Sequence, residues 1–136
     1  PGTEIKGILI KKMAKKGEEV ILGMNRYPIF GPLIMFGLGG IFVELFQDVV
    51  FRLAPVGRNS ARRMVRGIKG YKLFRGFRGR PVCDLESLEK AIVSLSEMCL
   101  NHPEILEMDI NPLLSHEQGS TVADCRIILS ETDVKK

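Results

Sequence analysis

Two runs of alternating residues decide the fold of this chain: Glu107-Met-Asp-Ile-Asn-Pro-Leu-Leu114 and Thr121-Val-Ala-Asp-Cys-Arg-Ile-Ile-Leu129. Apolar and polar side chains alternate in both runs, as they do in strands with one buried face. Residues 115–120 between them are mostly polar and include Gly119, which is typical of a turn. The two runs are therefore predicted to form a β-hairpin.

The register of this hairpin determines which side chains meet. If Asn111 lies opposite Asp124, then Asp109 lies opposite Arg126, and all four side chains share one face of the sheet. Three oxygen-bearing side chains then cluster beside one cation. A few hard oxygen ligands with room for water are what Mg²⁺ takes when substrate phosphates complete its shell. A solvated sheet face with a single Asp-Arg pair is the other interpretation of this pattern.

The composition describes one domain of ordinary size. The chain has 136 residues, of which 45% are hydrophobic, enough for a packed core. No apolar run reaches membrane-span length without a Gly, a Pro or a charged residue. Three widely spaced cysteines, with no Cys-x-x-Cys, give neither a disulfide framework nor a thiolate metal site. A cytoplasmic location is therefore predicted.

Charge is distributed unevenly along the chain, although the formal net charge is only +4. Residues 49–83 contain ten basic residues and no acidic one, whereas residues 84–136 contain eleven acidic residues against four basic ones. Such a cationic block can hold phosphate groups, bind nucleic acid or dock on an acidic partner surface. Neutralisation by the acidic segment of the same chain is an equally good interpretation, and composition alone does not separate these.

A coarse reading of the strand signals indicates an α/β (α+β) fold class. A first β-hairpin is expected from residues 8–13 and 20–24, around a turn at Ala14-Lys-Lys-Gly17. A third strand is expected at residues 32–36. Residues 41–45 and 49–53 are interpreted as a further pair of strands.

Two helices are expected between the strands. Asn59 or Ser60 can cap a short helix that ends near Gly70. Asp84 is expected to cap a longer amphipathic helix that stops before Pro103. The apolar stripe of that longer helix consists of Leu85, Leu88, Ile92, Leu95 and Cys99.

Three other local features could take part in binding or catalysis. The loop Gly37-Leu-Gly-Gly40 could bring backbone N–H groups close to a phosphate, but it lacks the Lys-Ser/Thr of a P-loop, which favours a structural turn. The run Phe74-Arg-Gly-Phe-Arg-Gly-Arg80 resembles RNA-binding segments, although a buried loop with two core phenylalanines has the same pattern. His102 and His116 lack the spacing of a metal pair and are expected to be surface residues.

Several motifs together resemble one family. They are Gly31-Pro-Leu-Ile-Met-Phe-Gly-Leu-Gly-Gly-Ile-Phe-Val-Glu44, Asp48-Val-Val-Phe-Arg-Leu-Ala-Pro55, Ile68-Lys-Gly-Tyr71, Phe77-Arg-Gly79 and Leu106-Glu-Met-Asp-Ile-Asn-Pro-Leu113. In this order they resemble the ATP-grasp (beta) subunit of ADP-forming acetyl-CoA and acyl-CoA synthetases, which are similar to succinyl-CoA synthetase. The resemblance implies an ATP-grasp fold, with a mixed or antiparallel sheet and flanking helices. It also implies an enzyme that interconverts acyl-CoA, ADP and phosphate with a free acid, ATP and CoA through a phosphohistidine.

The resemblance further implies roles for particular residues. Asn111 and Asp124 match the family's Mg²⁺ ligands, and Asp109 stands where relatives carry an acidic residue next to the metal, as a second-rank ligand or water anchor. Backbone groups around Met13 are implied to read the base of ATP or ADP, and Glu19 to bind the ribose hydroxyls. Lys12 is a departure, because relatives usually have Glu there and an ammonium group accepts no hydrogen bond.

The resemblance implies that the chain is one portion, 1–136, of an ATP-grasp domain whose N-terminal subdomain is missing. Residues 1–30 are expected to form a hairpin of the nucleotide clamp. Residues 31–136 are expected to form the C-terminal subdomain, with the metal-binding hairpin at 106–129. No catalytic residue is expected in this portion, since the phosphohistidine of the family would lie in the absent part.

A CoA-binding alpha subunit or fused domain is the partner that the resemblance implies, in a hetero-oligomer without membrane attachment. Two alternatives stay open. A catalytically inactive ATP-grasp fragment acting as an interaction subunit would explain Lys12. An RNA-binding module using residues 52–80 is the weaker alternative, because it gives no reason for the carboxylates of the hairpin.

Overall fold

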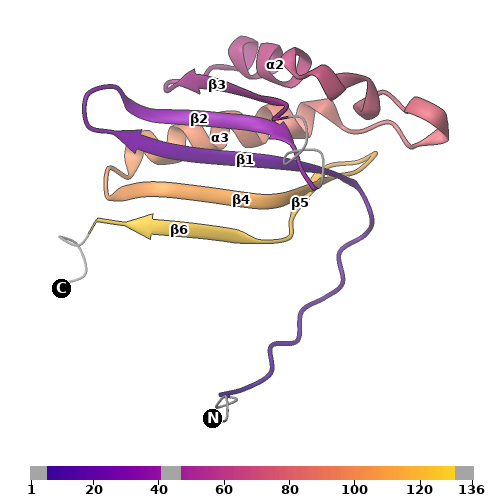
Figure 1. The fold of residues 1–136 in the computed structure, drawn as a ribbon, viewed down its shortest axis with the longest axis horizontal. Coiled ribbons are helices and arrows are strands. Elements are labelled where there is room, and N and C mark those ends of the chain that lie inside the picture. Colours follow the sequence, from indigo (N-terminus) through magenta and orange to yellow (C-terminus); the bar gives the residue numbers. More distant parts are fainter. Residues whose placement is uncertain (1–5, 41–46, 131–136) are drawn as a thin grey trace.

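Two long strands that are distant in the chain lie side by side at the centre of one antiparallel sheet (Figure 1). They are β1 (Glu18–Tyr27) and β4 (Ile105–Ser115). The computed structural model describes residues 6–40 and 47–130, and within them the sheet has six strands in the order β3-β2-β1-β4-β5, with β6 also paired to β4. The remaining strands are β2 (Gly31–Leu38), β3 (Val49–Leu53), β5 (Ser120–Val122) and β6 (Cys125–Leu129).

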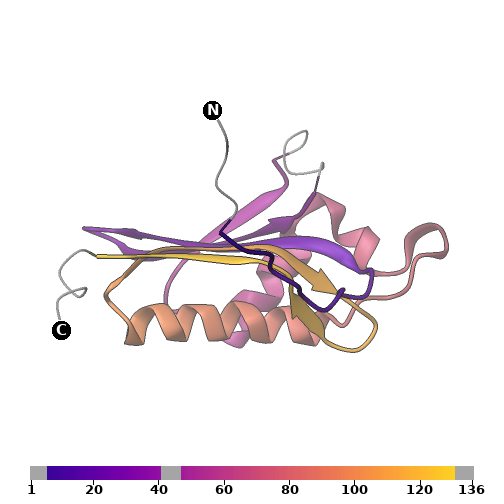
Figure 2. The same ribbon diagram turned by 90° about the horizontal axis from the view of Figure 1, so that it is seen from below.

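Helices cover one face of this sheet. Figure 2 shows α3 (Leu85–Asn101) lying along it, and α2 (Arg58–Gly67) packs against α3 and the strands β2 and β3. Two short 3₁₀ helices, η1 (Lys69–Phe74) and η2 (Phe77–Gly79), lie between α2 and α3. The core between the layers is apolar, and its largest fully buried side chains include Leu22, Met24, Ile34, Phe36, Met64, Phe74, Leu88 and Ile92. Burial of these apolar side chains is the main stabilising contribution to the fold.

Polar contacts fix both ends of α3. At its start, the carboxylate of Asp84 accepts hydrogen bonds from the N–H groups of Ser87 at 3.1 Å and Gly119 at 2.9 Å, so it caps the helix and anchors the β4–β5 turn. At its end, the guanidinium of Arg26 donates to the carbonyl oxygens of Cys99 and Ile105, at 2.5 and 2.8 Å. A cation at a helix C-terminus satisfies carbonyls that have no partner within the helix.

A buried carboxylate ties β3 to the segment that follows α2. Asp48 is only 5% exposed and accepts hydrogen bonds from the backbone N–H groups of Lys69 and Gly70, both at 2.7 Å. A buried charge needs such partners, because burial without them would be very costly. Asp48 therefore holds η1 against the sheet.

Most of the predicted elements are confirmed, including the antiparallel sheet with flanking helices. Residues 32–36 and 49–53 are strands, α3 follows its Asp84 cap, and Leu88, Ile92, Leu95 and Cys99 are buried as expected. Residues 41–45 lie outside the described residues. The first helix begins earlier than predicted, at Arg58, because the carbonyl of Gly57 accepts the N–H groups of Ser60 and Ala61, both at 2.9 Å. It also ends earlier, at Gly67.

The predicted hairpin between residues 8–13 and 20–24 is wrong. Residues 20–24 belong to β1, whereas residues 6–17 form no strand, and Ile8, Ile10 and Met13 are 88%, 90% and 91% exposed. The reason is that β1 pairs with β2 along one edge and with β4 along the other, so no edge of β1 is left for residues 8–13. In the described part of the chain, no helix is both long enough and apolar enough to cross a membrane.

Replacing Asp48 by Ala is expected to lower the free energy of unfolding by about 2 kcal/mol, because two backbone N–H groups lose a charged acceptor. Urea unfolding followed by circular dichroism would measure this. Asp124→Ala is the matched control, since Asp124 is an exposed carboxylate, and it should change stability by less than about 0.5 kcal/mol. Equal losses in the two variants would show that the buried contacts of Asp48 contribute nothing.

Stability should also depend on pH through Asp84. Hydrogen bonds from the backbone of Gly119, and then of Ser87, hold the pKa of Asp84 below its ordinary value of 3.8. The folded state then binds the proton less readily than the unfolded state, so the stabilisation is complete above that value and is lost as the pH falls through the lowered pKa. Asp84→Asn keeps a good helix cap without this titration.

We therefore expect the unaltered chain to lose more stability than Asp84→Asn when the pH is lowered from about 5 to about 2. Urea unfolding at each pH would measure the difference. Parallel pH profiles for the two proteins would contradict the role given to Asp84.

Candidate functional site

The predicted register of the β4–β6 hairpin is confirmed. Asp109 lies opposite Arg126, and the N–H of Asn111 donates to the carbonyl of Asp124 at 3.2 Å. Because side chains alternate along a strand, these four residues share one face of the sheet. Met108 and Ile110 on the opposite face are buried in the core, so the shared face is turned away from the helices.

Three oxygen-bearing side chains on this face are uncommitted. Asn111 and Asp124 are exposed and Asp109 is half-buried, and none of the three side chains makes a hydrogen bond or ion pair with another described residue. Arg126, which faces Asp109 in the ladder, donates instead to a carboxylate oxygen of Glu107 at 2.5 Å. The oxygens of Asp109, Asn111 and Asp124 are thus free to bind water or a cation.

A neighbouring thiol responds to the negative charge of this site. The pKa of Cys125 is raised above its ordinary value, first by burial and then by the negative charges of Asp109 and Asp124. A thiol whose pKa is raised stays protonated and is a poor nucleophile, so Cys125 has no evident covalent role. The same field would favour a bound cation.

The chemistry of this donor set fits a hard divalent cation. Carboxylate and amide oxygens suit Mg²⁺ or Ca²⁺, whereas Zn²⁺ prefers nitrogen and sulfur. Within residues 6–40 and 47–130, no three side chains of His, Cys, Asp or Glu come together as a metal site. An ion here would accordingly use the amide oxygen of Asn111 besides the two aspartates, with other ligands supplied from outside the protein.

A second feature is a hollow of about 360 Å³ where β1 begins and β2 ends. Its lining residues are Gly17, Glu18, Glu19, Leu38, Gly39, Gly40, Leu73 and Arg80. The N–H of Gly39 donates to the carbonyl of Glu19 at 2.7 Å. Gly40 has a φ of +64°, and a Cβ there would lie only 2.8 Å from a carboxylate oxygen of Glu19. The positive φ of Gly40 is the feature that favours glycine there. Of the structural turn predicted at residues 37–40, Gly37 and Leu38 belong instead to β2, and the chain leaves the strand at Gly39.

An ion pair spans the same hollow. One guanidinium nitrogen of Arg80 lies 2.9 Å from both carboxylate oxygens of Glu18. The pair joins the start of β1 to the segment between η2 and α3. Because Arg80 is already engaged, it is a weaker candidate for binding a phosphate than the sequence alone suggests.

The structure brings only some of the predicted site residues together. Asp109, Asn111 and Asp124 lie on one face, and Glu19 lines the hollow. Lys12 and Met13 are exposed in the segment before β1 and line neither feature. Sequence reasoning missed the pairing of Arg126 with Glu107. The diagonal neighbour rule for antiparallel strands could have found it, because Glu107 is two residues from Asp109 on the same face.

The exposure of the side chains decides between the interpretations of residues 74–80 and of the two histidines. Phe74 is fully buried with its ring centroid 6.4 Å from that of Phe36, whereas Phe77 is 47% exposed. The two histidines are surface residues, as predicted. His102 pairs with Glu104 at 2.9 Å, and His116 lies 3.3 Å from the hydroxyl of Thr121.

Comparisons with known proteins identify the family of the chain. The ATP-grasp domain family matches residues 1–129. The ADP-forming acetate–CoA ligase I of Archaeoglobus fulgidus is 46% identical over 131 residues, which are 96% of this chain and 19% of that protein. Subunit beta of the ADP-forming acetate–CoA ligase I of Pyrococcus furiosus is 46% identical over 129 residues, which are 95% of this chain and 56% of that subunit. The chain thus spans between about a fifth and just over half the length of these relatives.

Solved structures give the same result. The dinucleotide-forming acetyl-coenzyme A synthetase 1 of Ca. Korarchaeum cryptofilum, in complex with coenzyme A, Ca-AMPCP and HgCl+, superposes with a TM-score of 0.88 at 46% identity. The match covers 93% of this chain and 56% of that one. The complex of the same synthetase with coenzyme A and Mg-AMPPCP superposes with a TM-score of 0.82, also at 46% identity, over 86% of this chain and 55% of that one.

Proposed function

Because the chain belongs to the ATP-grasp domain family, we propose that it is the nucleotide-binding part of an ADP-forming acyl-CoA synthetase. The complete enzyme would interconvert acyl-CoA, ADP and phosphate with a free acid, ATP and CoA through a phosphohistidine. The observation that carries the proposal is the register of β4 and β6, which collects the uncommitted oxygens of Asp109, Asn111 and Asp124 on one open face. Complexes of the Korarchaeum synthetase with Mg-AMPPCP and Ca-AMPCP support a metal-bound nucleotide as the ligand.

In this proposal, Asn111 and Asp124 hold Mg²⁺, and Asp109 is a second-rank ligand or anchors its water. When bound, Mg²⁺ would neutralise the negative charge of the nucleotide phosphates. The residues of the chain orient the ligands. The hairpin fixes Asn111 opposite Asp124, and Glu107 holds the guanidinium of Arg126 on the same face.

The structure supports fewer residues for binding the base and the ribose of the nucleotide than the sequence predicts. We keep Glu19 as the acceptor for the ribose hydroxyls, because its carboxylate borders the hollow beside Gly40. Lys12 and Met13 stay predictions that the hollow does not support. The division of the chain into residues 1–30 of a clamp and residues 31–136 of a second subdomain is likewise a proposal.

The CoA site and the acyl-phosphate chemistry are assigned to a partner subunit or a fused domain. The Pyrococcus relatives are named as beta subunits, whereas the Archaeoglobus relative is more than five times as long as its matched region. Neither His102 nor His116 is assigned as the phosphorylated histidine. The three cysteines are free thiols, which suits a reducing compartment such as the cytoplasm.

Calorimetric titration with ATP and ADP, each with and without Mg²⁺, tests the proposal. We expect Asp124→Asn to weaken Mg²⁺-dependent nucleotide binding at least tenfold, because a ligand charge is lost while the shape is kept. Glu117→Gln is the matched control, an exposed carboxylate in the β4–β5 turn, and it should bind as the unaltered chain does. Unchanged binding by Asp124→Asn would refute the metal assignment. No binding by the unaltered chain would mean that this portion, which spans just over half of the Pyrococcus beta subunit, does not form the nucleotide site by itself.

A further inference from the structure

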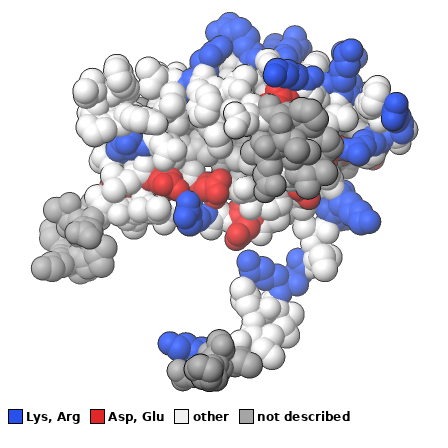
Figure 3. All heavy atoms as spheres, viewed as in Figure 1, with Lys and Arg blue, Asp and Glu red and all other residues white. Residues whose placement is uncertain are grey.

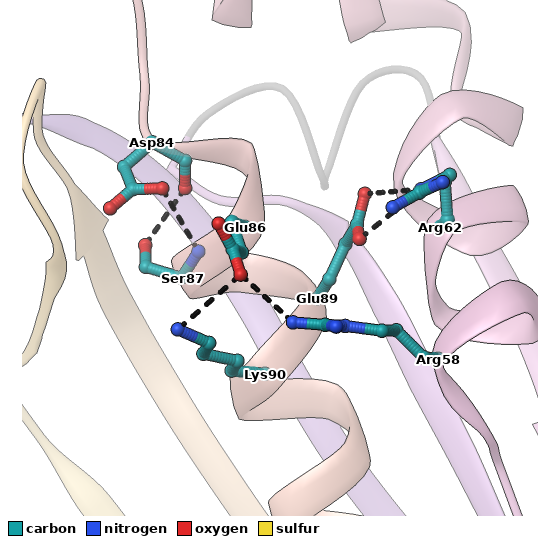
Figure 4. A network of polar contacts seen from close by, with 7 residues as sticks. All are labelled: Arg58, Arg62, Asp84, Glu86, Ser87, Glu89 and Lys90. Carbon is teal, nitrogen blue, oxygen red and sulfur yellow. Dashed lines mark hydrogen bonds and ion pairs between the residues drawn. The ribbon is translucent and has the colours of Figure 1, made fainter.

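The cationic block of residues 49–83 is only partly neutralised in the folded chain. Figure 4 shows two of the neutralising contacts, in which residues of α2 meet carboxylates of α3. Arg58 lies 2.8 Å from Glu86, and Arg62 lies 3.3 Å from Glu89. With the pair between Arg80 and Glu18, three of the ten cations have a carboxylate partner. A fourth, Arg52, donates to the backbone carbonyl of Phe51.

The other six cations form a continuous set along the chain that we call the basic ridge. All six are exposed, and none of their side chains has a carboxylate or other hydrogen-bond partner within the described residues. They are Arg63, Arg66, Lys69, Lys72, Arg75 and Arg78. Figure 3 shows Lys and Arg side chains gathered along the rim formed by α2 and the segment that follows it, apart from the acidic side chains on the sheet.

This concentration of charge does not serve the stability of the fold. Arg63 and Arg66, whose side chains have no carboxylate partner among the described residues, stand three residues apart on α2, where like charges are neighbours and repel each other. Departures from local rules without a structural benefit are expected at functional sites.

The residue types of the ridge favour nucleic acid over a protein surface as its ligand. Cores of protein–protein interfaces are depleted in charged residues, whereas interfaces with nucleic acid are strongly positive. The ridge contains six cations and one exposed aromatic residue, Phe77, whose ring centroid lies 5.3 Å from the guanidinium carbon of Arg78. An exposed ring beside a guanidinium group can stack on an unpaired base, while neighbouring cations hold phosphates.

The backbone around Phe77 is also open to a close approach. The open side is at Gly79, which has a φ of +77° and nothing within 4 Å of an added Cβ, whereas a Cβ at Gly76 would lie 3.0 Å from the carbonyl oxygen of Arg80. Phe74, the other aromatic residue of this motif, is buried, so the ridge offers a single ring. We propose that the basic ridge and Phe77 bind single-stranded nucleic acid, a function beyond the nucleotide site and independent of it.

Fluorescence anisotropy with a fluorescein-labelled 15-nucleotide oligouridine tests this proposal, at KCl concentrations from about 50 to 200 mM. Each phosphate contact on a single strand contributes about −0.7 to the slope of log affinity against log salt. For roughly four to six contacts we expect a slope of about −3 to −4, which is about a 50- to 300-fold loss of affinity over this range. A slope near zero would overturn the proposal.

Charge-reversal variants separate the ridge from net charge. The triple variant Arg66→Glu, Lys69→Glu and Lys72→Glu is expected to weaken binding at least 50-fold. The matched control reverses three exposed lysines outside the ridge, Lys11, Lys15 and Lys16, and so changes the net charge equally. It should weaken binding only a few-fold, and equal losses would overturn the proposal. If circular dichroism shows that the ridge variant is unfolded, glutamine replaces glutamate in both triple variants.

A separate pair of variants tests whether the ring of Phe77 stacks on a base. Phe77→Ala should weaken binding about tenfold, as expected for the loss of one stacked base. Phe51→Ala should have no effect, because Phe51 is equally exposed at 47% but lies on β3. A labelled 15-residue oligoglutamate peptide that binds as tightly as the oligouridine, with Phe77→Ala silent, would overturn the proposal in favour of an acidic protein surface.

Discussion

The antiparallel pairing of β1 with β4 is the constraint on which the rest of the structure depends. The ladder runs from Glu18 opposite Ser115 to Asn25 opposite Glu107, and it therefore joins residues that are 82 to 97 positions apart in the chain. Through it, the glycine loop at the end of β2 and the carboxylates of β4 become parts of one rigid sheet. It also occupies the second edge of β1, which leaves residues 6–17 without a strand partner.

Sequence patterns predicted the pairing of strands that are close in the chain, but not the pairing of strands that are distant in the chain. The register of β4 and β6 follows from alternation across a short turn, so the grouping of Asp109, Asn111 and Asp124 was predictable. Residues 8–13 begin with three consecutive apolar residues, Ile8 to Ile10, which favour a strand, but this signal carries no information on which edge of the sheet is free. The true neighbours of β1 are β2 and β4, and only packing of the whole sheet selects them. The contact between Arg126 and Glu107 was missed because it is diagonal.

The sequence shows how many basic residues the block contains, but not which of them pair with carboxylates in the folded chain. Ten basic residues in one block fit a neutralised surface and a binding surface equally well. The packing of α2 against α3 decides between them for each residue. Glu86 and Glu89 of α3 pair with Arg58 and Arg62 of α2 (Figure 4). The six side chains of the ridge have no carboxylate partner in the part of the chain that the structure describes. Helix geometry therefore defines where the ridge begins.

The charge of the oxygen-rich face sets a condition on any ligand there. Glu107, Asp109 and Asp124 carry three negative charges, and Arg126 supplies the single positive charge on that face of the hairpin. A nucleoside triphosphate, itself strongly negative, would be repelled by this arrangement. A divalent cation cancels the excess of two negative charges and gives the phosphates a positive centre to bind. At the nucleotide site that we propose, binding would therefore depend on a divalent cation for electrostatic reasons, whichever of the three oxygen-bearing side chains contacted the ion.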